Sequence, residues 1–220
     1  MIGIAGPLSA QSAPAQLAQD EAIVTFEVEW PDADPQWYQL SIDSAGRAVY
    51  QSQPHLAPGE TPGEPYILKF NVSRQCVEEV FRLAGELQYF HGQFDDLGRK
   101  VAQTGAKTLG YQDDTRSERT TYNASTNRQL SELTTLMQNI AGTLELDGKL
   151  RYALRFDHLG VEALLKSMEE MNKSGELAEL QAVAPTLREI ANDPAMMGMT
   201  RNRARRLLAA ARVPASAARP

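Results

Sequence analysis

Hydrophobic residues alternate with polar ones in the first part of the chain and recur every three or four residues in the second part. The change falls near Asn123. Alternation is typical of strands with one buried face, whereas a spacing of three or four is typical of amphipathic helices. The sequence therefore predicts a β-rich region followed by a helical region.

Four strands are predicted before the first helix. The first spans residues 22–30, and the others begin near Trp37, Ala48 and Tyr66. Asp43-Ser-Ala-Gly46 has the residues of a tight hairpin turn. Residues 53–65 contain four prolines and two glycines, which predicts a surface loop between the third and fourth strands.

A helix and a second hairpin follow these strands. Ser73 is expected to cap a helix whose apolar stripe runs from Cys76 to about His91, where Gly92 ends it. Residues 100–111 and 116–122 predict two more strands. Because they carry few large apolar side chains, we expect them on a sheet face or edge that is open to water.

The remainder is predicted to be helical almost to the end. The predicted helices are residues 127–142, 161–171 and 177–190, and a last one capped by Thr200. Pro185 should kink or break the third of these. Residues 149–156 fit both a strand and a helix, and the flanking helices favour a helix.

This order of elements predicts an α+β fold. An antiparallel sheet with a packed helix (β-β-β-β-α-β-β-α) is expected to precede a C-terminal helical bundle, since helices and strands alternate too rarely for a doubly wound parallel sheet. The predicted divisions are a leader (1–19), a sheet unit (20–125), a helical region (126–212) and a disordered tail (213–220).

Charge is distributed unevenly along the 220 residues, which carry a net charge of −6. Residues 20–125 have a net charge of −8, and residues 193–220 have +5. The acidic body argues against broad nucleic-acid binding, because phosphate repels it. No stretch approaches the roughly 18 consecutive apolar residues of a membrane-spanning helix.

The first 19 residues contain no Asp, Glu, Lys or Arg, and Ala13-Pro-Ala15 matches the small-residue pattern that signal peptidases cleave. We interpret them as the end of a signal peptide, which predicts a periplasmic or secreted protein. The alternative is a disordered leader on a cytoplasmic protein. Cys76 is the single cysteine, so an intramolecular disulfide is impossible.

Four arginines near the C-terminus form the clearest electrostatic signal: Arg201, Arg203, Arg205 and Arg206. A helix bearing them is a candidate contact for RNA, an anionic surface or an acidic protein. The alternative, which we favour, is a solvated helix whose arginines pair with the acidic body. The segment has no aromatic residue on which a base would stack.

No catalytic, cofactor or metal constellation stands out. Cys76 lies on an apolar stripe, where a thiol is usually a small core residue. The histidines His55, His91 and His158 are isolated, and His91 with Asp95 is a weak metal pair. Residues 104–108 resemble the end of a phosphate-binding loop, but they lack its glycines and lie in a predicted strand. Trp30, Trp37 and Tyr38 are expected in the core.

Several segments resemble the corresponding parts of uncharacterised bacterial envelope proteins. They are the run Trp37–Tyr50, the helix that begins after Ser73 and ends in Gln88-Tyr-Phe90, the second hairpin and the helix from Asn127. The resemblance covers about residues 22–145. It implies an exported location and no activity, cofactor or site residue.

The predicted function is a non-enzymatic, exported bacterial protein that binds another protein or supports an envelope structure, with no cofactor and no evident small-molecule substrate. One alternative is an RNA- or anionic-surface-binding module that uses the arginine-rich helix. The other is a hydrolase whose site is not recognisable in the sequence. The envelope hypothesis predicts an exposed apolar patch on the folded surface.

Overall fold

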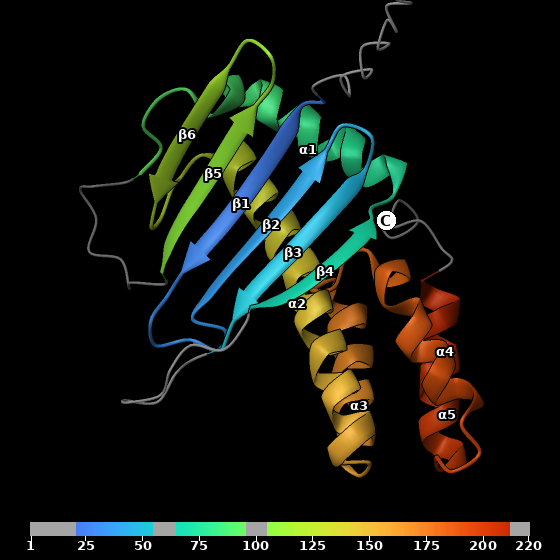
Figure 1. Cartoon of the computed structure of the whole chain (residues 1–220). Helices are drawn as coiled ribbons and strands as arrows, with labels where there is room; N and C mark the ends of the chain where they lie inside the picture. Colours follow the sequence, from blue (N-terminus) through green and yellow to red (C-terminus); the bar gives the residue numbers. More distant parts are fainter. Residues whose placement is uncertain (1–20, 55–64, 96–104, 212–220) are drawn as a thin grey trace, which may run out of the picture.

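The computed structural model describes residues 21–54, 65–95 and 105–211. An antiparallel sheet is covered on one face by two helices, and further helices extend beyond one end of the sheet (Figure 1). The predicted α+β class is confirmed. The predicted leader, the tail, His55 and most of the proline-rich loop lie outside the described residues.

Six strands form the sheet in the order β4-β3-β2-β1-β5-β6. They are β1 (Ile23–Glu29), β2 (Trp37–Asp43), β3 (Arg47–Gln53), β4 (Tyr66–Asn71), β5 (Ala106–Gln112) and β6 (Ser117–Tyr122). All neighbouring strands are antiparallel. The first four form a meander, and the second hairpin adds to the opposite edge of β1.

Alternation fixes the two faces of the sheet. Val24, Phe26 and Val28 of β1 are buried, whereas Glu27 points to the open face. The predicted hairpin turn is confirmed, because Oδ1 of Asp43 accepts hydrogen bonds from the backbone N–H groups of Ala45 (3.0 Å) and Arg47 (2.8 Å).

The second hairpin is only partly the open element that the sequence predicts. β6 is an edge strand, but β5 lies between β1 and β6 and buries Leu109 and Tyr111 against the helices. Polar residues alternate with these core positions in β5. The strand is therefore more buried than its small number of large apolar residues predicts. Residues 100–104 of the predicted strand lie outside the described residues.

Helix α1 (Arg74–Glu86) begins where Ser73 caps it, since Ser73 Oγ accepts a hydrogen bond from the N–H of Cys76 at 3.2 Å. The predicted end near His91 was wrong. A short turn, η1 (Gln88–Phe90), follows with positive φ at all three residues. The turn places Phe90 in the core, which offsets the backbone strain.

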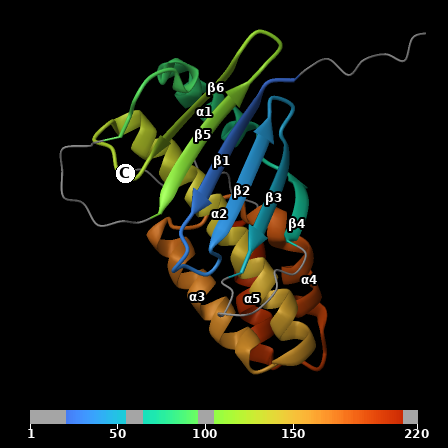
Figure 2. The same cartoon turned by 60° about the vertical axis from the view of Figure 1, so that its left-hand side comes forward.

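Helix α2 (Arg128–Phe156) is 29 residues long and is capped by Asn127, whose Oδ1 accepts a hydrogen bond from Leu130 N. The predicted end at Gly142 was wrong, because the helix continues through that residue. The helical interpretation of residues 149–156 is confirmed. The first half of α2 packs under the sheet, and the second half projects beyond it (Figures 1 and 2).

The remaining helices pack beside the projecting half of α2. They are α3 (Gly160–Ser174), the short η2 (Leu180–Val183), α4 (Ala184–Asn192) and α5 (Gly198–Ala210). Helix α3 runs to Ser174 rather than to residue 171, and Gly175 ends it in the left-handed conformation. The break predicted at Pro185 is present as a new helix that starts there. Thr200 was wrong as a cap, because it lies buried inside α5.

One hydrophobic cluster runs from the covered face of the sheet into the helices. Because α2 contributes to both regions, the division between residues 125 and 126 stays a prediction. None of the described helices is long and apolar enough to cross a bilayer.

Candidate interaction surface

Cys76 has the setting of a core residue. It is buried in the first turn of α1, and burial raises the pKa of its thiol well above the usual range, with Glu179 and Glu79 adding to the effect. A thiolate nucleophile needs the opposite environment. Cys76 does line a cavity of about 610 Å³ between α1, the α3–η2 connection and the end of α5, but no described histidine lines it.

The two residues of the weak metal pair, His91 and Asp95, make separate contacts with other residues. His91 Nδ1 lies 3.4 Å from Glu118 Oε2, while Oδ1 of Asp95 accepts hydrogen bonds from the backbone N–H groups of Asn123 and Ala124. His158 is exposed in the α2–α3 connection. Within the described ranges, no group of three or more metal-ligating side chains converges.

Most of the residues that resemble a phosphate-binding loop, 104–108, belong to strand β5. Lys107 is a buried residue of β5 whose ammonium donates hydrogen bonds to the carbonyls of Gly105 (3.4 Å) and Asn123 (3.0 Å). Burial lowers the pKa of this lysine. Its role is structural, and no helix begins there to complete a phosphate site.

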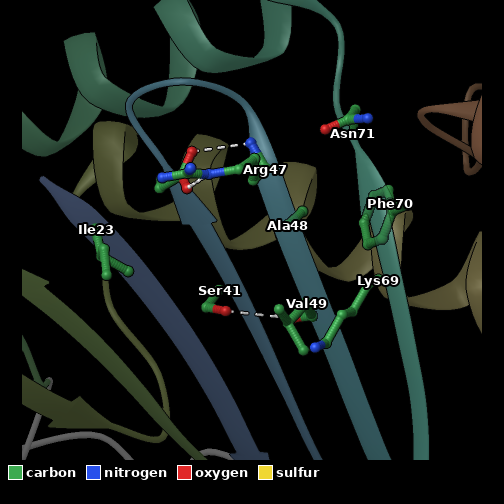
Figure 3. Close-up of a pocket in the computed structure, with 9 residues that line it drawn as sticks. Ile23, Ser41, Arg47, Ala48, Val49, Lys69, Phe70 and Asn71 are labelled. Atoms are coloured by element: carbon green, nitrogen blue, oxygen red, sulfur yellow. Dashed lines mark hydrogen bonds and ion pairs between the residues drawn. The ribbon is translucent and has the colours of Figure 1, made fainter. Parts of the chain in front are cut away.

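A shallow hollow of about 450 Å³ lies on the open face of the sheet (Figure 3). Ser41, Val49 and Lys69 come from adjacent strands, and Ser41 Oγ donates to the carbonyl of Val49 at 3.4 Å. Arg47 Nε donates to Asp43 Oδ2 at 2.6 Å. Ser41 and Arg47 are thus engaged in bonds within the hollow.

A buried polar contact joins the sheet to α2. Asp147 is fully buried and accepts a hydrogen bond from Arg151 Nε at 2.8 Å, and Tyr50 donates to Glu145 at 2.6 Å. Oδ1 of Asp147 and the hydroxyl of Tyr66 are buried without a hydrogen bond of normal geometry to the described residues. Asp147 has no solvent-exposed surface, and it lines neither the hollow on the sheet nor the cavity beside Cys76.

Burial raises the pKa of the Asp147 carboxyl, and the nearby Thr186 hydroxyl and Arg151 guanidinium offset part of that effect. The pKa of Tyr66 is raised by burial first and by the charge of Asp147 second. The pair is therefore a source of pH-dependent stability rather than a catalytic dyad.

The four predicted contact arginines share helix α5, but two of them bond to carboxylates of α3. Arg203 Nε donates to Glu162 at 2.6 Å and a second nitrogen pairs with Glu169. Arg206 Nε donates to Glu169 at 2.6 Å. The hydrogen bond from Arg206 is the main reason that the pKa of Glu169 is lowered, and Arg203 adds to it.

The other two arginines have different surroundings. Arg205 donates hydrogen bonds to Asn202 Oδ1 (2.8 Å) and to the carbonyl of Ala191 (3.0 Å). Nε of Arg201 is buried without a hydrogen-bond partner among the described residues. That these arginines contact an anion or a partner stays a prediction.

Large exposed apolar side chains gather at two helix connections. We call them the distal patch: Tyr152 (64% exposed), Phe156 (70%), Leu159 (82%), Met197 (56%) and Met199 (56%). The first three lie at the α2–α3 connection and the methionines at the α4–α5 connection. Both views place these connections at the same end of the molecule, away from the sheet (Figures 1 and 2).

The length of α2 explains why its part of the patch is exposed. A Cβ on Gly148 would lie 3.9 Å from the ring of Tyr66, so this position still faces the sheet. Tyr152 and Phe156 follow at intervals of four residues on the same side of the helix, beyond the sheet. Their rings contact each other, with centroids 5.0 Å apart.

Acidic side chains at this end are engaged in local bonds. Asp157 Oδ1 accepts from Gly160 N at 3.1 Å, Asp193 Oδ1 accepts from Ala195 N at 2.8 Å, and Glu162 pairs with Arg203. Arg155, next to the aromatic pair, is exposed and makes no ion pair with the described residues. Asp157 and Asp193 keep their negative charges in these bonds, but the three nearby arginines for which no ion pair is found among the described residues, Arg155, Arg201 and Arg205, outnumber them. The distal patch therefore has a weakly basic border on an otherwise acidic protein.

Of the three aromatic residues predicted in the core, only Tyr38 packs against it. Tyr38 packs against the core, with its ring centroid 6.1 Å from that of Phe26, whereas Trp37 is half-buried. The prediction was wrong for Trp30, which is 38% exposed just after β1.

The sequence analysis did not predict the distal patch. Its available signal was an i, i+4 aromatic pair between charged residues.

Neither the models of known protein families nor the curated proteins contain a match to this chain. The resemblance to bacterial envelope proteins therefore stays a prediction.

Proposed function

We propose that this chain is a non-enzymatic protein of the bacterial cell envelope that binds another envelope component, a protein or a supporting structure, through the distal patch. The observation that carries the proposal is the set of five exposed apolar side chains at one end. Water-exposed apolar clusters are uncommon on monomeric proteins and usually mark interaction sites.

Folding alone gives no reason for this patch. The side chains do not fill the core, and the rings of Tyr152 and Phe156 contact each other while both remain mostly exposed. Polar residues at the same positions would maintain the helix at no cost in packing. A binding role gives the exposed aromatic surface a purpose.

The envelope location is supported by Ala13-Pro-Ala15 and by the resemblance over about residues 22–145. The arginine-helix alternative has less support, because Arg203 and Arg206 already bond to Glu162 and Glu169. A hydrolase that uses Cys76 has less support too, because burial disfavours the thiolate.

Site-specific photo-crosslinking tests the proposal. The full chain would carry a photoreactive phenylalanine analogue at position 156 or, as a control, at Ile67, which is also exposed but lies on the sheet. In irradiated bacteria we expect a discrete adduct, with a protein or with a lipid, from position 156 only. No adduct of either kind at position 156, or the same adduct from both positions, would contradict the proposal.

A further inference from the structure

The distal patch is formed by two helix ends and the connections that follow or precede them. Tyr152 and Phe156 lie in the last turns of α2 and Leu159 in the connection to α3, whereas Met197 directly precedes α5 and Met199 lies in its first turn. None of these side chains lines the hollow on the sheet, the cavity beside Cys76 or the two pockets lined by Lys107. Grooves or pockets are the usual receptors for a helix or peptide of a protein partner. Projecting apolar tips instead suit a surface into which they can insert.

The kinds of side chain agree with a lipid interface. Tyrosine rings favour the boundary between headgroups and acyl chains, and phenylalanine and leucine supply apolar area to it. Methionine is flexible and fits an irregular apolar environment. Five such residues at one end allow shallow insertion without a spanning helix.

The charges near the patch favour an anionic surface. Arg155 is exposed beside Phe156, and the guanidinium of Arg205 reaches the carbonyl of Ala191 at the end of α4. The ion pairs of α5 in the described chain involve Arg203 and Arg206, which leaves Arg205 without a carboxylate. Each basic residue near an anionic leaflet raises the partition coefficient by roughly fivefold.

The overall charge selects one orientation. The chain has a net charge of −6, and residues 20–125 alone carry −8. An anionic surface repels the region that includes the sheet and attracts the basic border of the distal patch. The molecule would therefore approach end-on, with the sheet far from the lipid (Figure 1).

We infer that the component bound by the distal patch is the anionic surface of a lipid bilayer, into which the two helix ends insert. This inference rests on the proposed function and specifies its partner. A protein partner is the competing outcome of the test below.

Vesicle co-sedimentation of the full chain tests the inference. The probes are vesicles of phosphatidylcholine alone and vesicles of equal parts phosphatidylcholine and phosphatidylglycerol. We expect binding to the mixed vesicles to exceed binding to the neutral ones at least several-fold and to weaken as salt increases. Phe156→Ser should lower the partition coefficient about tenfold through lost apolar area, and Leu159→Ser should have a similar effect.

Two matched variants control for apolarity and charge. Arg155→Gln should reduce binding to the mixed vesicles roughly fivefold, whereas Arg128→Gln, at the opposite end of the same helix, should leave it unchanged. Ile67→Ser removes an exposed apolar side chain from the sheet and should also have no effect. Circular dichroism of each variant verifies the fold.

No binding to mixed vesicles, equal binding to both vesicle types, or equal losses from Phe156→Ser and Ile67→Ser would overturn the inference. A protein adduct from position 156 in cells, together with no vesicle binding, would overturn it and leave the proposed function intact. The absence of both the adduct and vesicle binding would overturn both.

Discussion

The two halves of α2 differ in their relation to water, although they form one continuous helix. Between Leu130 and Leu144 most apolar side chains are buried. Between Asp147 and Phe156 the helix still buries Leu150 and Ala153, but it also buries a carboxylate and exposes two aromatic rings. The first half has the pattern that folding requires. The second half departs from it, and such departures are expected where a residue serves a function.

The contrast extends to what holds each region together. The sheet and the first half of α2 share an apolar core. Beyond the sheet, α5 is joined to α3 by Arg203 and Arg206 around Glu169, in addition to apolar contacts. The helical end therefore depends more on ionic bonds, and its stability should respond more to pH.

Replacing one side chain in each half of α2 by alanine should give the largest difference in stability between the two halves. Met137→Ala removes a fully buried side chain and should lower the free energy of unfolding by about 2–5 kcal/mol. Phe156→Ala removes an exposed ring and should change it by about 0.5 kcal/mol or less. Urea unfolding of both variants measures the difference. Similar losses would show that Phe156 is part of the core, contrary to the comparison.

Glu169→Gln should weaken the helical end. The carboxylate bonds to Arg203 and Arg206, and we expect a loss of about 1–3 kcal/mol, less than for a fully buried pair because Arg206 is largely exposed. Glu170→Gln is the matched control, since Glu170 is exposed and its one ion pair among the described residues, with Lys166, is long at 3.9 Å. A control loss as large as that of Glu169→Gln would refute the assignment.

The pH dependence of this contribution has a defined sign. Because the pKa of Glu169 is lowered in the folded state, its stabilisation is present above the unfolded pKa and is lost as pH falls through the folded pKa. The difference between wild type and Glu169→Gln should therefore shrink on acidification. A difference that grows with acid would contradict the ion-pair account.

Asp147→Asn should show the opposite dependence on pH. The pKa of Asp147 is raised by burial, so its favourable contribution is present below the unfolded pKa and is lost as pH rises through the folded pKa. The variant should gain stability relative to wild type as pH rises from the acid range. Thr186→Val removes a hydroxyl that lowers this pKa and should extend the effect to higher pH. Urea unfolding across pH measures both, and parallel curves for wild type and Asp147→Asn would exclude the mechanism.

Local signals in the sequence predict most of the strands and several helix ends. Asp43 and Gly46 specify a hairpin, Ser73 and Asn127 cap helices, and Gly175 ends α3, because each acts through bonds with near neighbours. Tertiary packing decides where local signals fail. Gly142 does not end α2, whose stability comes from packing on both the sheet and α3.

The candidate site was less predictable from the sequence. The four arginines were visible, but the carboxylates that engage Arg203 and Arg206 lie more than 30 positions away in the chain. Tyr152 and Phe156 have the spacing of a core stripe. Only the position where the sheet ends shows that they face water, and that position depends on the assembled fold.

Hydrogen–deuterium exchange of the full chain, with and without anionic vesicles, tests most directly whether the distal end is the binding end. The account predicts slower exchange in the presence of vesicles at residues 152–160 and 197–201, and unchanged exchange in the sheet. Slower exchange on β2, β3 and β4 with none at the two helix connections would contradict it.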